Sequence, residues 1–87
     1  MPAAASQSAM SERVRAAIEQ AILGSIADAS VSVTGEGGHY AIEVVAPVFE
    51  GRSRLQRDRL VMQAISPLMR GEAAPVHAVD ALVTRPR

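Results

Sequence analysis

Histidines are the side chains of this chain best suited to bind a metal. The 87 residues include two histidines and no cysteine. His39 follows a glycine-rich turn, and His77 opens a predicted strand after Pro75. A neutral imidazole is a common metal ligand, although a histidine near an apolar strand is more often a hydrogen-bonded residue at the edge of the core. Without a thiolate, side-chain metal bonds must come from histidine or carboxylate, and two histidines cannot complete a site alone.

A run of arginines at the start of a predicted helix is the second group of candidates: Arg52, Arg54, Arg57 and Arg59. Cations here oppose the helix dipole at a cost of a few tenths to about 1 kcal/mol each, so a chain that keeps them could use them to bind an anion or an acidic partner. A solvated helix end, with Arg54 paired to Asp58, explains the same residues more simply. The formal net charge of zero argues against a protein that binds nucleic acid by charge alone.

No catalytic constellation is recognisable in the sequence. Glu36, Glu43 and Glu50 are spread over a turn, a strand and a loop, and no serine forms a known motif with a histidine and a carboxylate. Gly35–Gly38 lacks the residues of a phosphate-binding loop and is typical of a hairpin turn. We therefore expect that the protein is not an enzyme.

The composition predicts one small globular domain with an aliphatic core. Hydrophobic residues make up 48% of the chain, and its large aromatic side chains are Tyr40 and Phe49. The N-terminal residues have neither the basic start of a signal peptide nor a long apolar run, so we expect a cytoplasmic protein without a membrane span. We predict a flexible tail over residues 1–10, the domain over residues 11–84 and a short tail over residues 85–87.

Helical and strand patterns divide this domain into five elements. Apolar residues spaced by three or four from Val14 to Ile22 predict a first helix, capped by Ser8 or Ser11. Alternating residues predict strands over 31–34 and 39–46, joined as an antiparallel hairpin. Ser53 is expected to cap a second helix, and Pro67 to open a short final turn after it. The apolar face of the second helix consists of Leu60, Val61, Ala64, Ile65 and Leu68.

The last strand is predicted over residues 76–84, with strict alternation of its side chains. Val76, Ala78 and Leu82 should face one way, and His77, Val79, Ala81 and Val83 the other. A right-handed crossover through the second helix would place this strand parallel to a hairpin strand. The predicted fold is therefore α/β (α+β), in the order α-β-β-α-β, with a three-stranded mixed sheet covered by helices on one face.

The stretch from Phe49 to Val61 resembles the central signature of the BolA-like family. The matching residues are Phe49, Glu50, Gly51, Arg52 and Ser53, followed by Leu55, Arg57, Arg59 and Val61. Val76-His77-Ala78 resembles the family's second landmark, a histidine that opens the last strand. His39-Tyr40 resembles a pair that often starts the second strand. The resemblance covers roughly residues 14–83 and implies a fold similar to class II KH domains.

The resemblance also implies a partner and a shared cofactor. In this family a monothiol glutaredoxin and a BolA-like protein share a [2Fe-2S] cluster. The resemblance implies that such a complex acts in iron homeostasis or in the stress response. The partner's cysteine and glutathione bind one iron, and histidines of the BolA-like protein bind the other. His77 matches the C-terminal ligand position, and His39 is the local candidate for a second ligand. The turn before Tyr40 is short and lacks the Cys or His that some members carry.

The alternative function implied by the resemblance is DNA binding and transcriptional regulation. Its contacts would lie on the loop and helix from Phe49 to Val61, which are also candidate partner contacts. Asp58 puts a negative charge on this surface where many members have histidine. A third hypothesis is self-association, for example as a homodimer, through an exposed sheet face. The candidate contact residues are Phe49, Gly51, Arg52, Ser53, Arg54, Arg57 and Arg59.

Overall fold

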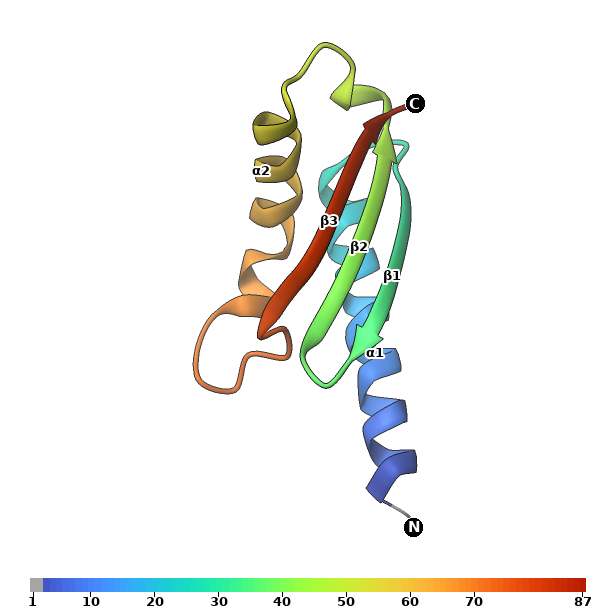
Figure 1. Cartoon of the computed structure of the whole chain (residues 1–87), viewed down its shortest axis with the longest axis vertical. Helices are drawn as coiled ribbons and strands as arrows, with labels where there is room; N and C mark the ends of the chain where they lie inside the picture. Colours follow the sequence, from blue (N-terminus) through green and yellow to red (C-terminus); the bar gives the residue numbers. More distant parts are fainter. Residues whose placement is uncertain (1–2) are drawn as a thin grey trace.

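A mixed sheet of three strands forms one layer of the molecule, and two helices form the layer behind it (Figure 1). The computed structural model describes residues 3–87. Strand β2 is central: it pairs antiparallel with β1 and parallel with β3. The predicted fold class, element order and parallel last strand are confirmed. The elements are α1 (Ala3–Ser25), β1 (Ser30–Glu36), β2 (His39–Ala46), α2 (Arg54–Ile65) and β3 (Ala78–Pro86), with short 3₁₀ helices η1 (Pro47–Phe49) and η2 (Ser66–Met69).

The core lies between the sheet and the two helices, as the apolar patterns predict. Alternate residues of β2 are buried from Tyr40 to Ala46, because successive side chains of a strand point to opposite faces. The helices and loops add Ile18, Ile22, Phe49, Val61, Ile65 and Val76, all almost fully buried. We call the uncovered face of the sheet, with His39, Ala41 and Glu43 of β2, the open face. Within the described residues, no helix is both long and apolar enough to cross a membrane.

The first two strands are joined by a two-residue turn, Gly37-Gly38. Glu36 pairs with His39, and the two glycines have φ angles of 64° and 86°. A tight hairpin turn with positive φ at both central positions favours glycine, which has no Cβ to clash. The prediction of a hairpin turn within Gly35–Gly38 is confirmed.

Helix α1 begins earlier than the sequence pattern predicts. Because it starts at Ala3, Ser8 and Ser11 lie inside the helix, and the prediction that one of them caps it is wrong. Ser11 is buried, and its Oγ accepts the Gly37 N–H at 3.2 Å. Part of the predicted flexible tail, residues 1–2, lies outside the described residues. Ser11 therefore links α1 to the hairpin turn by a hydrogen bond and does not cap the helix.

Helix α2 begins and ends where the sequence predicts. Ser53 Oγ accepts the Gln56 N–H at 3.2 Å, and the Gln56 side chain accepts the Ser53 N–H at 3.0 Å. These reciprocal bonds form a capping box, which fixes the start of the helix. Pro67 lies in the first turn of η2, as predicted. The predicted apolar face also holds, since Val61 and Ile65 are buried.

Strand β3 departs from the predicted alternation because it contains a bulge. Tyr40 pairs with Val79 and Ala41 with Ala81, so Asp80 is an extra residue without a partner in β2. Val79 and Leu82 both pack against the core, and the prediction that Val79 points the other way is wrong. The strand also begins at Ala78 instead of Val76 and continues to Pro86 instead of ending at Thr84.

Candidate functional site

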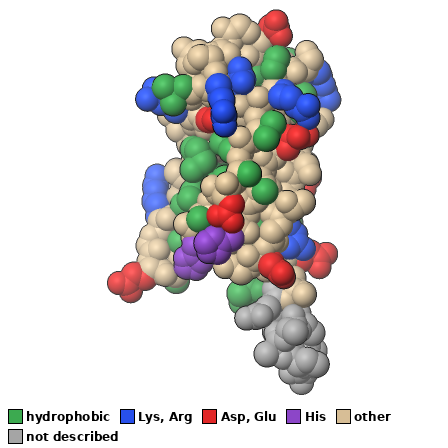
Figure 2. All heavy atoms as spheres, viewed as in Figure 1, with side chains coloured by type: hydrophobic (Ala, Val, Ile, Leu, Met, Phe, Trp, Pro, Cys, Tyr) green, Lys and Arg blue, Asp and Glu red, His purple; other side chains and the backbone are tan. Residues whose placement is uncertain are grey.

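The two histidines lie at the same end of the sheet, on either side of Gly38. The Gly38 carbonyl accepts the backbone N–H of His77 at 2.8 Å and that of Ala78 at 3.0 Å. Ala78 in turn pairs with His39 across β2 and β3. Figure 2 shows the histidine side chains as one patch on the open face, with an acidic side chain beside them. The structure therefore brings together the two residues that the sequence proposes as metal ligands.

His77 is held by its backbone but leaves its imidazole exposed. Its ring packs so closely on Gly38 that a Cβ at this position would overlap the ring. Among the described residues, no side chain or backbone group hydrogen-bonds to the His77 ring nitrogens. An exposed imidazole without a hydrogen-bond partner at either nitrogen can offer a lone pair to a metal.

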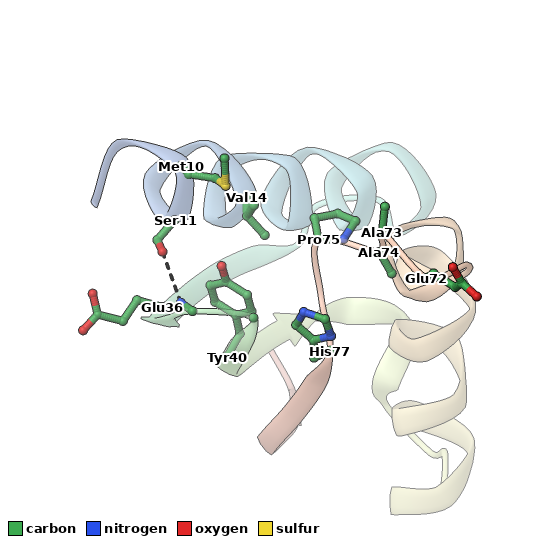
Figure 3. A pocket seen from close by; sticks show the side chains of 12 residues that line it. Met10, Ser11, Val14, Glu36, Tyr40, Glu72, Ala73, Ala74, Pro75 and His77 are labelled. Carbon is green, nitrogen blue, oxygen red and sulfur yellow. Dashed lines mark hydrogen bonds between the residues drawn. The ribbon is translucent and has the colours of Figure 1, made fainter. Parts of the chain in front are cut away.

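A cavity of about 520 Å³ lies beside His77, between α1, the hairpin turn and the loop before β3 (Figure 3). Met10, Val14, Tyr40 and Pro75 give it apolar walls. Glu36 and Glu72 also line the cavity, and in Figure 3 their side chains extend outward from its apolar part. The sequence gives no sign of this cavity, because it depends on how α1 and the loop before β3 pack around the turn. An apolar side chain of another protein could occupy it next to His77.

His39 differs from His77 in having a carboxylate partner. Its Nδ1 lies 3.2 Å from Asp80 Oδ1, and both side chains are about three-fifths exposed, at 60% and 59%. The bulge in β3 explains the contact, because Asp80 is the extra residue next to the His39 end of β2. Asp80 is not among the residues that the sequence suggested for the site. The one feature that could have pointed to it is its charge among the apolar residues of the last strand.

The histidine end can supply part of a metal site. Among residues 3–87, no three His, Cys, Asp or Glu side chains lie close enough to hold a metal ion. The available donors are two imidazoles, one on the first residue of β2 and one on the residue just before β3. In Rieske [2Fe-2S] centres two histidines replace two cysteines on one iron, so an imidazole donor set is compatible with such a cluster. His77 and His39 thus match the imidazole donors of such a centre, and they can supply only part of its ligands.

The arginine candidates lie at the opposite end of the sheet. Arg57 Nε donates to the carbonyl and to Oγ1 of Thr84, both at 3.2 Å, near the end of β3. The stretch of β3 from Ala78 to Thr84 spans roughly 20 Å at the usual rise of a strand. In Figure 2 several arginine side chains gather at the end away from the histidines. The histidines and the arginines therefore do not form one site.

Several residues of the predicted contact set have structural roles. Phe49 is fully buried, Gly51 turns the chain with a φ of 77°, and Ser53 caps α2. Arg57 also donates from Nη1 to the Arg52 carbonyl at 2.9 Å, so its guanidinium joins α2, β3 and the loop.

The other arginines of the set are more accessible. Arg52 Nε donates to the Val48 carbonyl at 2.9 Å, and Arg54 pairs with Asp58 at 3.5 Å as the sequence predicts. Arg59 is exposed. Arg52, Arg54 and Arg59 therefore remain accessible to a partner or to DNA.

Known proteins match this chain in sequence pattern and in fold. A family model described as BolA-like protein matches residues 11–86. A BolA protein homologue from Coxiella burnetii is 31% identical, with a TM-score of 0.58, over 79% of this chain and 82% of that one. BolA1 from Mus musculus is 30% identical, with a TM-score of 0.62, over 83% of this chain and 64% of that one.

A more distant structure supports the same fold. BolA1 from Arabidopsis thaliana is 15% identical, with a TM-score of 0.68, over 83% of this chain and 89% of that one. None of the curated proteins matches the chain.

Proposed function

Because the chain belongs to the BolA-like family, we propose that it is a non-enzymatic cytoplasmic adaptor that binds a monothiol glutaredoxin and shares a [2Fe-2S] cluster with it. The partner's cysteine and glutathione supply the thiolates, because this chain has no cysteine. His77 supplies the imidazole on this side, and His39 is the candidate for a second. The biological role that follows is in iron homeostasis or the stress response.

The position of His77 is the observation that carries this proposal. The backbone N–H bond to the Gly38 carbonyl and the contact with Gly38 hold the residue, while the ring remains accessible. A ligand that is fixed before its partner arrives loses little conformational entropy on binding. The chain therefore presents a preformed imidazole at one end of the sheet.

The cavity beside His77 gives the partner a place to dock. Its apolar walls, which include Val14 and Tyr40, can bury an apolar side chain next to the cluster. Burial of apolar surface stabilises a complex by about 25 cal/mol per Å² before the costs of association. In this proposal the contact also shields the iron ligands from water.

The direct test is a titration of a cluster-loaded monothiol glutaredoxin, with glutathione, by this protein. Visible absorption and circular dichroism should change and saturate near one equivalent. His77→Ala should abolish the change, whereas the control Gln63→Ala, on the exposed face of α2, should leave it intact. A spectrum that never changes with the unmodified chain would refute the proposal.

DNA binding is the second candidate, favoured by the exposed Arg52, Arg54 and Arg59 at the other end of the sheet. It ranks below the first because Arg57 already donates to Thr84 and to the Arg52 carbonyl, and because Asp58 places a negative charge 3.5 Å from Arg54. Binding through several phosphates must weaken steeply as salt rises. If no DNA binding appears even at low salt, this alternative fails. Self-association as a homodimer also stays a prediction, which light scattering on the isolated protein would test.

A further inference from the structure

We infer that Asp80 is a positioning residue for His39: it fixes the imidazole in the Nδ1–H tautomer and leaves Nε2 as the atom that binds the shared metal. The inference rests on the proposed function and extends it from His77 to a second ligand. It starts from one contact, the 3.2 Å distance between His39 Nδ1 and Asp80 Oδ1.

The bulge in β3 is what makes this contact. Val79 pairs with Tyr40 and Ala81 with Ala41, so Asp80 is inserted between two paired residues. Val79 and Leu82 still reach the core, which leaves Asp80 on the open face, where His39 also lies. Bulges are common where a side chain must be re-aimed next to a functional site. Here the re-aimed side chain is a carboxylate, and its target is the ring of His39.

The chemistry of the contact decides which nitrogen is free. An ionised carboxylate can only accept hydrogen bonds, so the His39 nitrogen that faces it must carry the proton. With the proton on Nδ1, the lone pair of the neutral ring lies on Nε2. Metal-binding histidines almost always donate their other ring N–H to a carboxylate, a carbonyl or water, which fixes the tautomer and makes the ligand more basic. His39 Nδ1 and Asp80 Oδ1 lie 3.2 Å apart in the protein alone, within reach of such a bond.

A simple surface ion pair is the competing explanation. Exposed pairs usually contribute little to stability, and both partners here are more than half exposed. A contribution to stability therefore does not explain why the pair is there. Its position favours a role in metal binding, because the pair adjoins the exposed His77 at the end of the sheet where both histidines lie.

The first experiment measures the His39 tautomer in the 87-residue chain without any metal. Long-range ¹H–¹⁵N correlation spectra at mildly alkaline pH, where imidazoles are neutral, distinguish Nδ1–H from Nε2–H. The unmodified chain and Asp80→Glu should show Nδ1–H at His39, and Asp80→Ala should show a mixture. The control Glu72→Ala, which removes an exposed carboxylate nearby, should keep the Nδ1–H pattern. An unchanged tautomer in Asp80→Ala would overturn the inference.

The second experiment repeats the cluster titration with the same variants. Loss of a residue that orients a metal ligand typically weakens binding about 10- to 100-fold, so Asp80→Ala should raise the titration midpoint at least about tenfold. Asp80→Glu should restore the midpoint to near that of the unmodified chain. If Asp80→Ala changes the tautomer but leaves the midpoint unchanged, His39 is not a ligand and the inference is wrong.

The two experiments separate this inference from the proposed function. A cluster spectrum that never responds to the unmodified chain refutes the proposed function and, with it, the assignment of His39 Nε2 to the shared metal. The tautomer spectra then still decide whether Asp80 positions His39. A normal cluster response that is insensitive to Asp80→Ala refutes the inference alone.

Discussion

His77 contacts Gly38 through a backbone hydrogen bond and through its imidazole ring. The Gly38 carbonyl accepts the His77 N–H at 2.8 Å, and the His77 ring covers the space that a Cβ on Gly38 would need. Gly38 is also the last residue of the hairpin turn that leads into β2. The turn that starts the central strand therefore also sets the position of the candidate metal ligand.

Gly38→Ala should displace the His77 ring. Both turn glycines have positive φ, so alanine at either position costs about 1–2 kcal/mol of stability. Only at Gly38 does the added methyl group also meet His77, whereas a Cβ on Gly37 meets nothing within 4 Å. Gly37→Ala is therefore a matched control. Urea unfolding should show a larger loss for Gly38→Ala, and the His77 ring resonances should shift in that variant alone.

Equal stability losses and unchanged His77 resonances in both variants would show that the Gly38–His77 contact is unimportant. In that case the ring of His77 would not depend on the turn, and its preformed position would need another explanation.

Thr84→Val should loosen the attachment of α2 to β3. Thr84 is buried, and its Oγ1 donates to Asp58 Oδ1 at 2.7 Å while accepting from Arg57 Nε at 3.2 Å. Valine keeps the shape but removes both bonds to charged groups, so we expect a loss of about 1.5–3 kcal/mol in the free energy of unfolding. Thr34→Val, at an exposed position of β1, should change stability by less than about 0.5 kcal/mol. A similar loss in both variants would contradict the role of Thr84.

Ser53→Ala should destabilise α2 without affecting the histidine end. Loss of an N-cap side chain costs about 1 kcal/mol, and the reciprocal bond from Ser53 N–H to Gln56 would lose its geometry as well. Denaturant unfolding gives the stability, and the cluster titration should give the same midpoint as the unmodified chain. A shifted midpoint in a folded Ser53→Ala protein would instead support Ser53 as a partner contact.

Phe49→Leu should lower stability because Phe49 is a core residue. Its side chain is fully buried, so the smaller side chain leaves unfilled space, with a loss of about 1–3 kcal/mol. Thermal unfolding followed by circular dichroism measures this loss. We expect partner and DNA binding by the folded fraction to be unchanged. Weaker binding at unchanged stability would contradict this assignment and restore Phe49 as a contact.

The elements with regular periodicity were predictable from the sequence. The alternation from Tyr40 to Ala46 describes β2 correctly, because the strand is central and one of its faces is covered by helices. Ser53 is a local signal, and its capping bond depends only on residues that follow it directly. The sequence left open whether the two histidines meet; in the structure the parallel last strand brings the starts of β2 and β3 together.

The features that depend on tertiary contacts could not be read from the sequence. Ser11 is typical of an N-cap, but here it bonds to the Gly37 N–H far along the chain. The bulge at Asp80 cannot be recognised in the sequence of β3 alone, because the extra residue is defined by how β3 pairs with β2. The arginine run and His77 are separated by the length of β3, a distance that appears only once the direction of α2 and β3 is known.

Pulsed electron paramagnetic resonance on the reduced complex, with ¹⁵N in this chain alone and natural nitrogen in the glutaredoxin, tests most directly whether His77 binds the shared iron. If it does, the spectra show a ¹⁵N hyperfine coupling of the size expected for an imidazole bound directly to iron, and His77→Ala loses that coupling. A reduced cluster that shows no ¹⁵N coupling to the labelled chain, or the same coupling with and without the His77 imidazole, would show that His77 is not a ligand.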